Sequence, residues 1–309
     1  MKVFAISDLH LSFQTDKPMD LFGDQWANYE QRIMDDWNAR VGPGDVGIIA
    51  GDISWAMKME QAAEDFAFLK KLNGTKIIIR GNHDYWWKSI GKIRETLGPD
   101  IIALQNDSVK IGDFVFAGTR GWRVPERRMT QSGEDKKIYE REIIRFELAL
   151  KDAAAKITAG GVGEAPTLLA PPAPAGHPPL QGGKLVYESR AAGEQSLEIT
   201  GKQKAFPQLE SFADSPLAKG GGAKGDGGCE RVEVTSPAKL IAILHYPPFN
   251  ATRDDSPFTA LCEKYGVTAC VYGHLHGKNC RAELLTQKNG VDYYLTSCDL
   301  LQHKLVQII

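Results

Sequence analysis

The 309-residue chain lacks the features of several protein classes. Its net charge is only −2 and it has no run of basic residues, which argues against a general attraction to nucleic acid or to an anionic membrane. No apolar stretch approaches the roughly 20 residues that a membrane-spanning helix needs, and no signal peptide precedes the first apolar segment. The five cysteines form no C-x-x-C pair, so they indicate reduced thiols. We therefore expect a cytoplasmic protein without a membrane partner.

Short apolar segments that end in polar residues predict buried strands. They occupy residues 3–7, 46–50, 76–79, 114–117, 240–244, 269–272 and 293–296. Apolar residues at helical spacing predict helices over 26–37, 59–72 and 139–150, and Ser256 followed by Pro257 predicts the start of another. Strands and helices alternate in the first half, which favours parallel βαβ units, whereas residues 280–309 indicate consecutive strands. We expect an α/β fold with mixed sheets and helices outside them.

Residues 158–230 break this pattern. They contain 8 of the 16 prolines and 14 of the 31 glycines, and their apolar residues follow neither a strand nor a helix period. Such a composition buries too little apolar surface to offset the entropy lost when a chain becomes ordered. We predict one domain over residues 1–309, interrupted by a flexible low-complexity insertion at 158–230. The insertion is either a tolerated surface loop or a loop that covers the substrate.

Five short strings with polar side chains lie at or just after predicted strands. The strings are Asp8-Leu9-His10, Gly51-Asp52, Gly81-Asn82-His83-Asp84, His245 and Gly273-His274-Leu275-His276. They supply three carboxylates, one amide and five of the seven histidines in the chain. Ligand sites in sheets with βα connections gather at the carboxyl ends of the strands. The strings together therefore predict a hydrolytic centre with two metal ions.

The first string offers a carboxylate and an imidazole, and the second offers a carboxylate after a glycine. Side chains at positions i and i+2 of an extended segment point the same way, so Asp8 and His10 can converge on one cation. Gly51 allows a close backbone approach, and the two oxygens of Asp52 could bridge two cations. Each string alone is also common in ordinary turns. The prediction depends on the joint occurrence of all five strings at strand ends.

The third string adds groups of another kind. Asn82 offers a neutral oxygen to a metal, while His83 can reach past the metals to a bound phosphate. Asp84 could orient the His83 ring through a hydrogen bond. We expect His83 and Asp84 to act in catalysis.

The order D-x-H, G-D, G-N-H-[DE], H and G-H-x-H resembles that of the metallophosphoesterase, or calcineurin-like phosphoesterase, superfamily. The resemblance covers about residues 1–150 and 237–309. It implies a four-layer α-β-β-α sandwich with a dinuclear metal site at the carboxyl ends of the strands. It also implies the ligands by position: Asp8, His10 and His276 for the first metal, Asn82, His245 and His274 for the second, and Asp52 between both. His83 would lie near the leaving-group oxygen.

These groups would hydrolyse a phosphomonoester or a phosphodiester. A hydroxide between two metals about 3.5–4 Å apart would attack phosphorus, and His83 would stabilise the developing charge or protonate the leaving group. The ligands offer nitrogen and oxygen but no thiolate. This set favours two divalent transition-metal ions (Mn, Fe, Zn, Co or Ni) and does not choose among them.

Substrate contacts are less specific. Trp86 or Trp87 could stack on a base or an aromatic leaving group, or simply pack the following helix. Arg120 or Arg123 could hold a phosphate, or be solvated loop residues. We expect a small phosphorylated substrate. The alternatives are a nuclease, which would need a basic track, a protein phosphatase, or a non-catalytic scaffold of the same superfamily, which would typically have lost ligands. The sequence does not define the oligomeric state.

Overall fold

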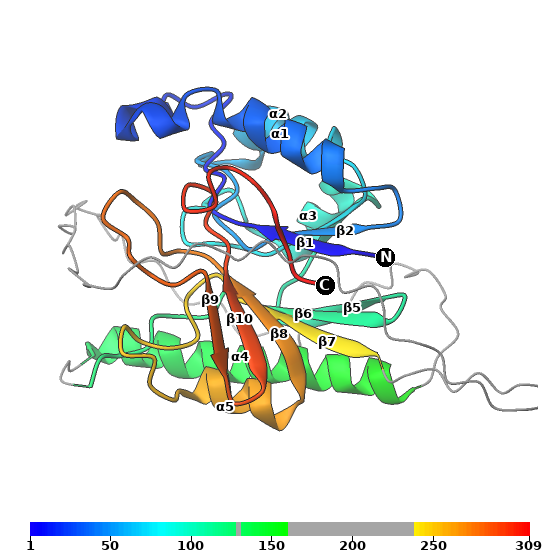
Figure 1. The fold of residues 1–309 in the computed structure, drawn as a ribbon, viewed down its shortest axis with the longest axis vertical. Coiled ribbons are helices and arrows are strands. Elements are labelled where there is room, and N and C mark those ends of the chain that lie inside the picture. Colours follow the sequence, from blue (N-terminus) through cyan, green and yellow to red (C-terminus); the bar gives the residue numbers. More distant parts are fainter. Residues whose placement is uncertain (128–130, 160–237) are drawn as a thin grey trace, which may run out of the picture.

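The computed structural model describes residues 1–127, 131–159 and 238–309. The predicted insertion lies, from residue 160 onward, outside these residues. Within them the chain forms two sheets with helices on their outer faces (Figure 1). None of the described helices combines the length and apolar character needed to cross a bilayer.

The first sheet is parallel except at one edge. Its strands lie in the order β11-β1-β2-β3-β4, and only β11 runs antiparallel to its neighbour. The apolar segments near the start of the chain form its centre, as predicted. Its strands are β1 (Val3–Ile6), β2 (Val46–Ile49), β3 (Thr75–Ile78), β4 (Ile101–Ala103) and β11 (Val306–Gln307).

The second sheet follows the order β5-β6-β7-β8-β10-β9. Its four inner strands are parallel, and the two edge strands are antiparallel to their neighbours. The hairpin of β9 and β10 agrees with the consecutive strands expected in 280–309, whereas the hairpin of β5 and β6 was not expected. Its strands are β5 (Asp107–Ile111), β6 (Phe114–Gly118), β7 (Lys239–Ile243), β8 (Val267–Tyr272), β9 (Leu285–Lys288) and β10 (Val291–Leu295).

Helices cover the outer face of each sheet (Figure 1). The first sheet carries α1 (Tyr29–Arg40), α2 (Ala63–Lys70) and α3 (Ile90–Leu97), with short 3-10 turns η1 (Met19–Phe22), η2 (Asp24–Trp26) and η3 (Met59–Ala62). The second sheet carries α4 (Gly133–Thr158) and α5 (Pro257–Lys264). The side-chain oxygen of Ser256 accepts hydrogen bonds from the backbone N–H groups of Phe258 and Thr259 at 3.1 and 3.2 Å, which confirms the predicted helix start.

Alternation along the strands produces three hydrophobic layers. In β1, Phe4 and Ile6 face the helices, whereas Val3 and Ala5 face the second sheet. A third layer lies between the second sheet and helices α4 and α5. The predicted α/β fold with four layers is thus confirmed.

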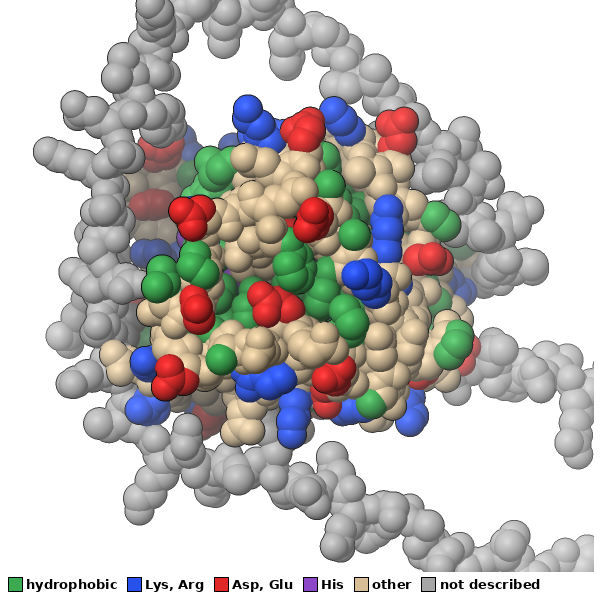
Figure 2. Space-filling view, turned by 90° about the horizontal axis from the view of Figure 1, so that it is seen from above, with side chains coloured by type: hydrophobic (Ala, Val, Ile, Leu, Met, Phe, Trp, Pro, Cys, Tyr) green, Lys and Arg blue, Asp and Glu red, His purple; other side chains and the backbone are tan. Residues whose placement is uncertain are grey.

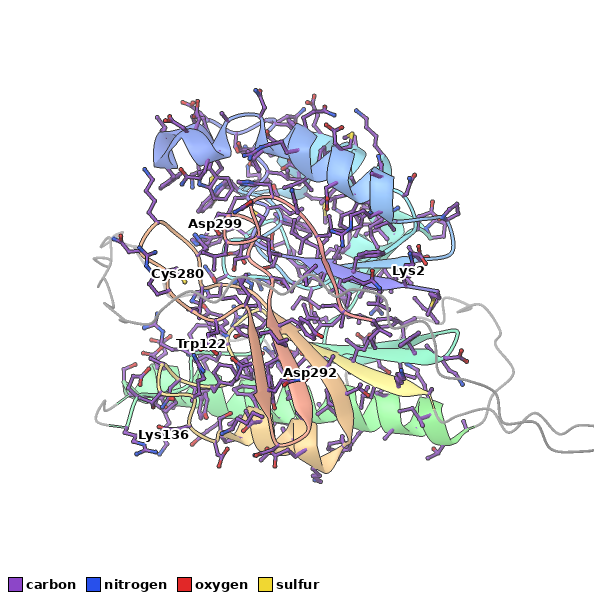
Figure 3. The ribbon with its side chains drawn as sticks, in the orientation of Figure 1. Lys2, Trp122, Lys136, Cys280, Asp292 and Asp299 are labelled. Carbon is purple, nitrogen blue, oxygen red and sulfur yellow. The ribbon has the colours of Figure 1, made fainter. Side chains whose placement is uncertain are left out.

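The parallel strands place their carboxyl ends at one end of the molecule. Figure 3 shows Trp122, which follows β6, and Asp299, which follows β10, at the end opposite Lys2, which precedes β1. Polar residues that follow strands in both sheets therefore meet at this end.

Candidate metal centre

The structure brings the five strings together between the two sheets. Asp8, Asp52 and Asn82 follow strands of the first sheet, and His245 and His274 follow strands of the second. Contacts between them cross the interface at several points, although up to 266 residues separate the partners in sequence. The predicted meeting of side chains at the strand ends is what the structure shows.

One group consists of Asp8, His10 and His276. Their ligand atoms lie within 4.8 Å of one another, and the Nε2 atoms of the two histidines are 3.4 Å apart. Ser7 Oγ and Ser297 Oγ donate hydrogen bonds to the Asp8 carboxylate at 2.6 and 2.8 Å. These hydroxyls fix the carboxylate, so the group offers one oxygen and two nitrogens in a defined arrangement.

A second group forms around the side-chain oxygen of Asn82. This oxygen lies 2.8 Å from His245 Nε2 and 2.8 Å from His274 Nδ1. His245 Nδ1 lies 3.0 Å from the carbonyl oxygen of Ala50. A proton on Nδ1 would satisfy that contact and leave the lone pair on Nε2 free for a cation.

Asp52 lies between the two groups. Its Oδ2 is 3.4 Å from His245 Nε2 and 4.0 Å from His10 Nε2. This oxygen is buried and has no hydrogen-bond partner among the described residues, whereas Oδ1 accepts the backbone N–H of His83 at 2.8 Å. A buried carboxylate oxygen is rarely left without a partner, and a cation would supply one. The ligand atoms of Asp8, Asp52 and His245 also lie within 4.8 Å of one another, so the residues at this position fit a divalent cation.

The electrostatics of the site also favour metal binding. Burial lowers the pKa of His10 to about 4 and that of His274 to about 3, so both imidazoles are neutral at pH 7. Burial also lowers the pKa of His245, but the Asp52 carboxylate raises it to about 9. Burial would raise the pKa of Asp52, but the nearby histidines, His245 first, hold it well below its usual range. His10, His274 and the ionised Asp52 are therefore ready to bind a cation, whereas His245 is protonated beside Asp52 and would release its Nε2 proton when a metal ion binds.

Four of the proposed ligands have left-handed backbones. The φ angles of Asp8, His10, Asp52 and His274 are 57°, 49°, 50° and 71°. This region is unfavourable for residues with a side chain, and such strain tends to cluster at functional sites. Asp8 and His10 converge because the backbone turns sharply at both, not because the segment is extended as we had expected.

Two motif glycines leave room for the carboxylates. A β-carbon on Gly81 would overlap with the Asp52 carboxylate, and one on Gly273 would overlap with Ser7 and crowd Asp8 Oδ2 at 2.5 Å. A side chain at either position would displace a proposed ligand. Glycine is thus required by close approach at both places.

Asp84 does not orient His83 as expected. Its oxygens accept backbone N–H groups of Gly81, Ile53 and Ser54 at 2.7–3.1 Å, and Nδ1 of His83 has no partner among the described residues. The carboxylate is fully buried, so it stabilises the turn that carries Asn82 and His83. Asp84 is better placed to support the loops than to take part directly in catalysis.

Trp86 was a wrong choice for a substrate contact. It is fully buried, packs on Phe66 with ring centroids 4.8 Å apart, and donates its indole N–H to Asp84 at 3.0 Å. Trp87 is also buried and donates to Gln105 at 2.7 Å. The alternative that we had left open, packing of the chain after the motif, is what the structure shows.

The two arginines differ in environment. The guanidinium of Arg120 is partly buried, 4.8 Å from the ring centre of Trp122 and 3.7 Å from the Glu142 carboxylate. Arg123 is exposed. Arg120 is therefore fixed in place near the ligand groups, whereas no contact in the described residues fixes Arg123.

Sequence reasoning missed two aromatic residues next to the ligands. The Trp55 ring stacks on His10 with centroids 4.7 Å apart and an angle of 19°, and its centroid lies 4.4 Å from that of His83. The Tyr246 ring lies 4.2 Å from His274. Both closely follow motif residues in sequence, but an aromatic residue there is indistinguishable from one in the core.

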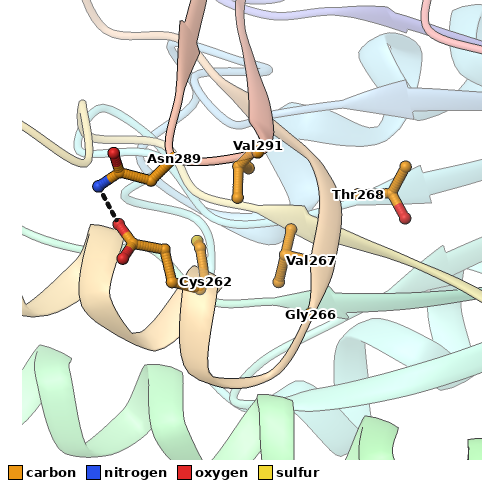
Figure 4. A pocket seen from close by; sticks show the side chains of 8 residues that line it. Cys262, Gly266, Val267, Thr268, Asn289 and Val291 are labelled. Carbon is orange, nitrogen blue, oxygen red and sulfur yellow. Dashed lines mark hydrogen bonds between the residues drawn. The ribbon is translucent and has the colours of Figure 1, made fainter.

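The hollow in Figure 4 does not belong to this centre. It is lined by residues of α5, of the amino end of β8 and of the turn before β10, and Asn289 in that turn donates a hydrogen bond to Glu263 of α5 at 2.7 Å. The ligand groups follow the other, carboxyl end of β8.

Comparisons with known proteins identify the family of the chain. A profile of calcineurin-like phosphoesterases matches residues 1–158. No curated protein matches the chain. Similar solved structures include phosphopantetheinyl hydrolase from Mycobacterium tuberculosis, with a TM-score of 0.45 and 12% identity over 100% of this chain and 95% of that one. TT1561 of Thermus thermophilus has a TM-score of 0.48 and 9% identity over 99% and 96%. The protein of unknown function AQ665 from Aquifex aeolicus has a TM-score of 0.31 and 16% identity over 47% and 73%. The family match covers half of the chain, which therefore belongs to the calcineurin-like phosphoesterase family.

Proposed function

We propose that this protein is a metal-dependent phosphoesterase that hydrolyses a phosphomonoester or phosphodiester of a small molecule. The observation that carries the proposal is the buried, unpartnered Oδ2 of Asp52 between two groups of nitrogen and oxygen ligands. The first group, Asp8, His10 and His276, and the second, Asn82, His245 and His274, would each hold one divalent transition-metal ion. When bound, the ions supply the Lewis acidity and the activated water that phosphoester hydrolysis requires.

Charge balance explains why such a site would attract a phosphate. Two divalent ions bring four positive charges, and the carboxylates of Asp8 and Asp52 neutralise two of them. A phosphate oxyanion can compensate for the rest, and it would do so most strongly as charge develops during the reaction.

His83 is the residue we assign to the leaving group. Its backbone N–H is fixed by Asp52 at 2.8 Å, and its half-buried ring lies beside Trp55. From this position the imidazole would stabilise or protonate the leaving-group oxygen. Asp84 would contribute indirectly by holding the turn, and Arg120 would contact the substrate.

The alternative activities have less support. On the face that Figure 2 views, positive and negative side chains are interspersed. The net charge of −2 and the lack of a basic run in the sequence do not favour a nuclease, which needs a basic track for the nucleic-acid backbone. A scaffold is not favoured either, because every expected ligand is present. Cys262, Cys270, Cys280 and Cys298 are free thiols, which fits the cytoplasmic location that we propose.

The test combines metal analysis with a substrate panel. The panel comprises p-nitrophenyl phosphate, its bis ester, cyclic nucleotides and single-stranded DNA, and it separates monoesterase, diesterase and nuclease. We expect Asp52→Asn to lose most bound metal and activity together, and His83→Ala to keep its metal but turn over about 10²–10⁴-fold more slowly. Asp113→Asn, at an exposed turn, is the matched control. Normal hydrolysis by metal-free Asp52→Asn protein would contradict the proposal.

A further inference from the structure

Two arginines lie on segments of the chain that carry or contact the second ligand group. Arg80 lies two residues before Asn82, and its Nε is buried without a hydrogen-bond partner among the described residues. Arg120 follows β6, and its carbonyl oxygen accepts the backbone N–H groups of His245 and Tyr246 at 2.9 and 3.1 Å. The backbone thus ties both arginines to segments that carry ligands.

A row of aromatic rings connects the Arg120 guanidinium with the ligands. The guanidinium lies 4.8 Å from the ring centre of Trp122, the Trp122 ring lies 5.1 Å from that of Tyr246, and Tyr246 lies 4.2 Å from His274. Two rings therefore stand between Arg120 and the nearest imidazole in this row. A phosphate held at the ligand groups would leave this guanidinium available for a different group.

The carboxylate that lies against Arg120 is shared with a second guanidinium. The buried carboxylate of Glu142, on α4, accepts a hydrogen bond from Arg145 at 2.7 Å and lies 3.7 Å from Arg120. Burial lowers the pKa of Arg120, Glu142 opposes this, and the charges of Arg80 and Arg145 lower it further, as expected if these guanidiniums lie near one another. One carboxylate thus serves more than one guanidinium, and a partly buried charge without a partner is costly.

We propose that Arg80 and Arg120 form a subsite for a second anionic group of the substrate, a phosphate or a carboxylate, on the His245 and His274 side of the metal centre. This inference rests on the proposed function and narrows its substrate class to small molecules that carry an anionic group besides the phosphoester. Guanidinium groups suit either anion because their N–H donors match two oxygens at once. Glu142 is a positioning residue that keeps Arg120 in place.

The test uses three phenyl phosphates that differ at the para position. One carries a carboxylate, one a second phosphate and one a neutral carboxamide. With the metal-loaded full-length protein we expect KM to be at least 10-fold lower for one or both charged compounds than for the carboxamide. The two charged compounds show which anion is preferred. Equal KM values for all three compounds would overturn the subsite.

Substitutions of the two arginines test whether the difference in KM arises at the proposed subsite. Arg80→Met and Arg120→Met should each raise KM for the preferred anionic compound at least 10-fold more than KM for the carboxamide. Glu142→Gln should also raise KM for the preferred anionic compound more than KM for the carboxamide, by a smaller factor, and should leave kcat largely intact. Arg127→Met is the control, because Arg127 is exposed and paired with Asp254 at 2.6–2.7 Å. If Arg120→Met does not fold, Arg120→Lys tests the same contact, because lysine keeps the charge but lacks the paired N–H donors of the guanidinium.

Failure of the subsite is distinguishable from failure of the proposed function. If the wild-type protein hydrolyses the three compounds and the arginine variants change KM equally for all of them, only the subsite is wrong. If the wild-type protein binds no divalent metal and hydrolyses none of them, the proposed function is wrong and the subsite is wrong with it.

Discussion

The two sheets supply different chemistry to the same centre. The first sheet brings both proposed carboxylate ligands, the Asn82 amide and His10, all within the first 82 residues. The second sheet brings only imidazoles, from His245, His274 and His276. Neither sheet completes a ligand group, because the first group needs His276 and the second needs Asn82. Metal binding should therefore depend on the packing of one sheet against the other.

The surroundings of the two ligand groups differ as well. Beside His10 and His83, the exposed Lys17 places its Nζ 4.6 Å from the centre of the Trp55 ring. Beside His274, the rings of Tyr246 and Trp122 lead to the partly buried Arg120. We infer that the first side serves the leaving-group step, since it contains His83. The second side serves substrate recognition.

The largest loss of metal binding and activity should follow when a single methyl group is added at a motif glycine that follows a strand of either sheet. Gly81→Ala would push against Asp52, and Gly273→Ala would push against Ser7 and Asp8. We expect each to lower bound metal and to reduce kcat/KM at least 100-fold, while circular dichroism shows a retained fold. Gly133→Ala is the control, since nothing lies within 4 Å of the added carbon. Full metal content in one glycine variant but not the other would show that the two sheets do not share the centre equally.

The sequence identified the proposed ligands but not their local geometry. Residue types and their order were enough to name Asp8, Asp52 and His274, yet their left-handed backbones depend on tertiary contacts that no local pattern encodes. Trp86 was misassigned because a tryptophan after a motif has the same sequence signature whether it packs or binds. Asp84 was misassigned because its partners, Ile53 and Ser54, come from a distant loop.

The same limit applies to the fold. The central strands were predicted because both of their faces are buried and apolar. We did not predict β4 or β5. For β9, β11 and helix α3 we expected only strands somewhere in 280–309 and a helix after Trp87, without bounds. β5 and β9 mix polar and apolar residues at the sheet edges, β4 and β11 are only three and two residues long, and α3 has eight residues. Short edge elements depend on their neighbours more than on their own sequence.

A smaller effect should separate the two sides of the centre kinetically. Trp55→Leu removes the ring that packs on His10 and His83, so we expect kcat to fall about 10- to 100-fold with little change in KM. Trp122→Leu removes the ring under Arg120, so we expect KM to rise with little change in kcat. Steady-state kinetics on an anionic substrate measure both. The same pattern in both variants would contradict the division of labour between the two sides.

The smallest effect concerns a contact between the end of the chain and the first helical layer. The His303 ring lies 5.1 Å from Trp26 and 5.6 Å from Tyr29, and both ring nitrogens are buried without partners among the described residues. Tyr29 in turn donates a hydrogen bond to the carbonyl oxygen of His10 at 3.0 Å. Burial lowers the pKa of His303 to about 4, with a smaller contribution from Arg32. This end of the chain therefore supports the first ligand group as well as closing the first sheet.

The pH dependence follows from the sign of this shift. An unfolded histidine has a pKa of about 6.5, so between pH 6.5 and 4 the unfolded state binds the proton and the folded state does not. The contribution of His303 to stability is complete above pH 6.5 and declines as the pH falls towards 4. Replacement by leucine removes this titration. We therefore expect His303→Leu to reduce the loss of unfolding free energy between pH 7 and 5.5 by about 1 kcal/mol, measured by urea denaturation. An unchanged pH dependence would mean that the His303 ring is hydrated in solution and that this end of the chain is held by its backbone contacts instead.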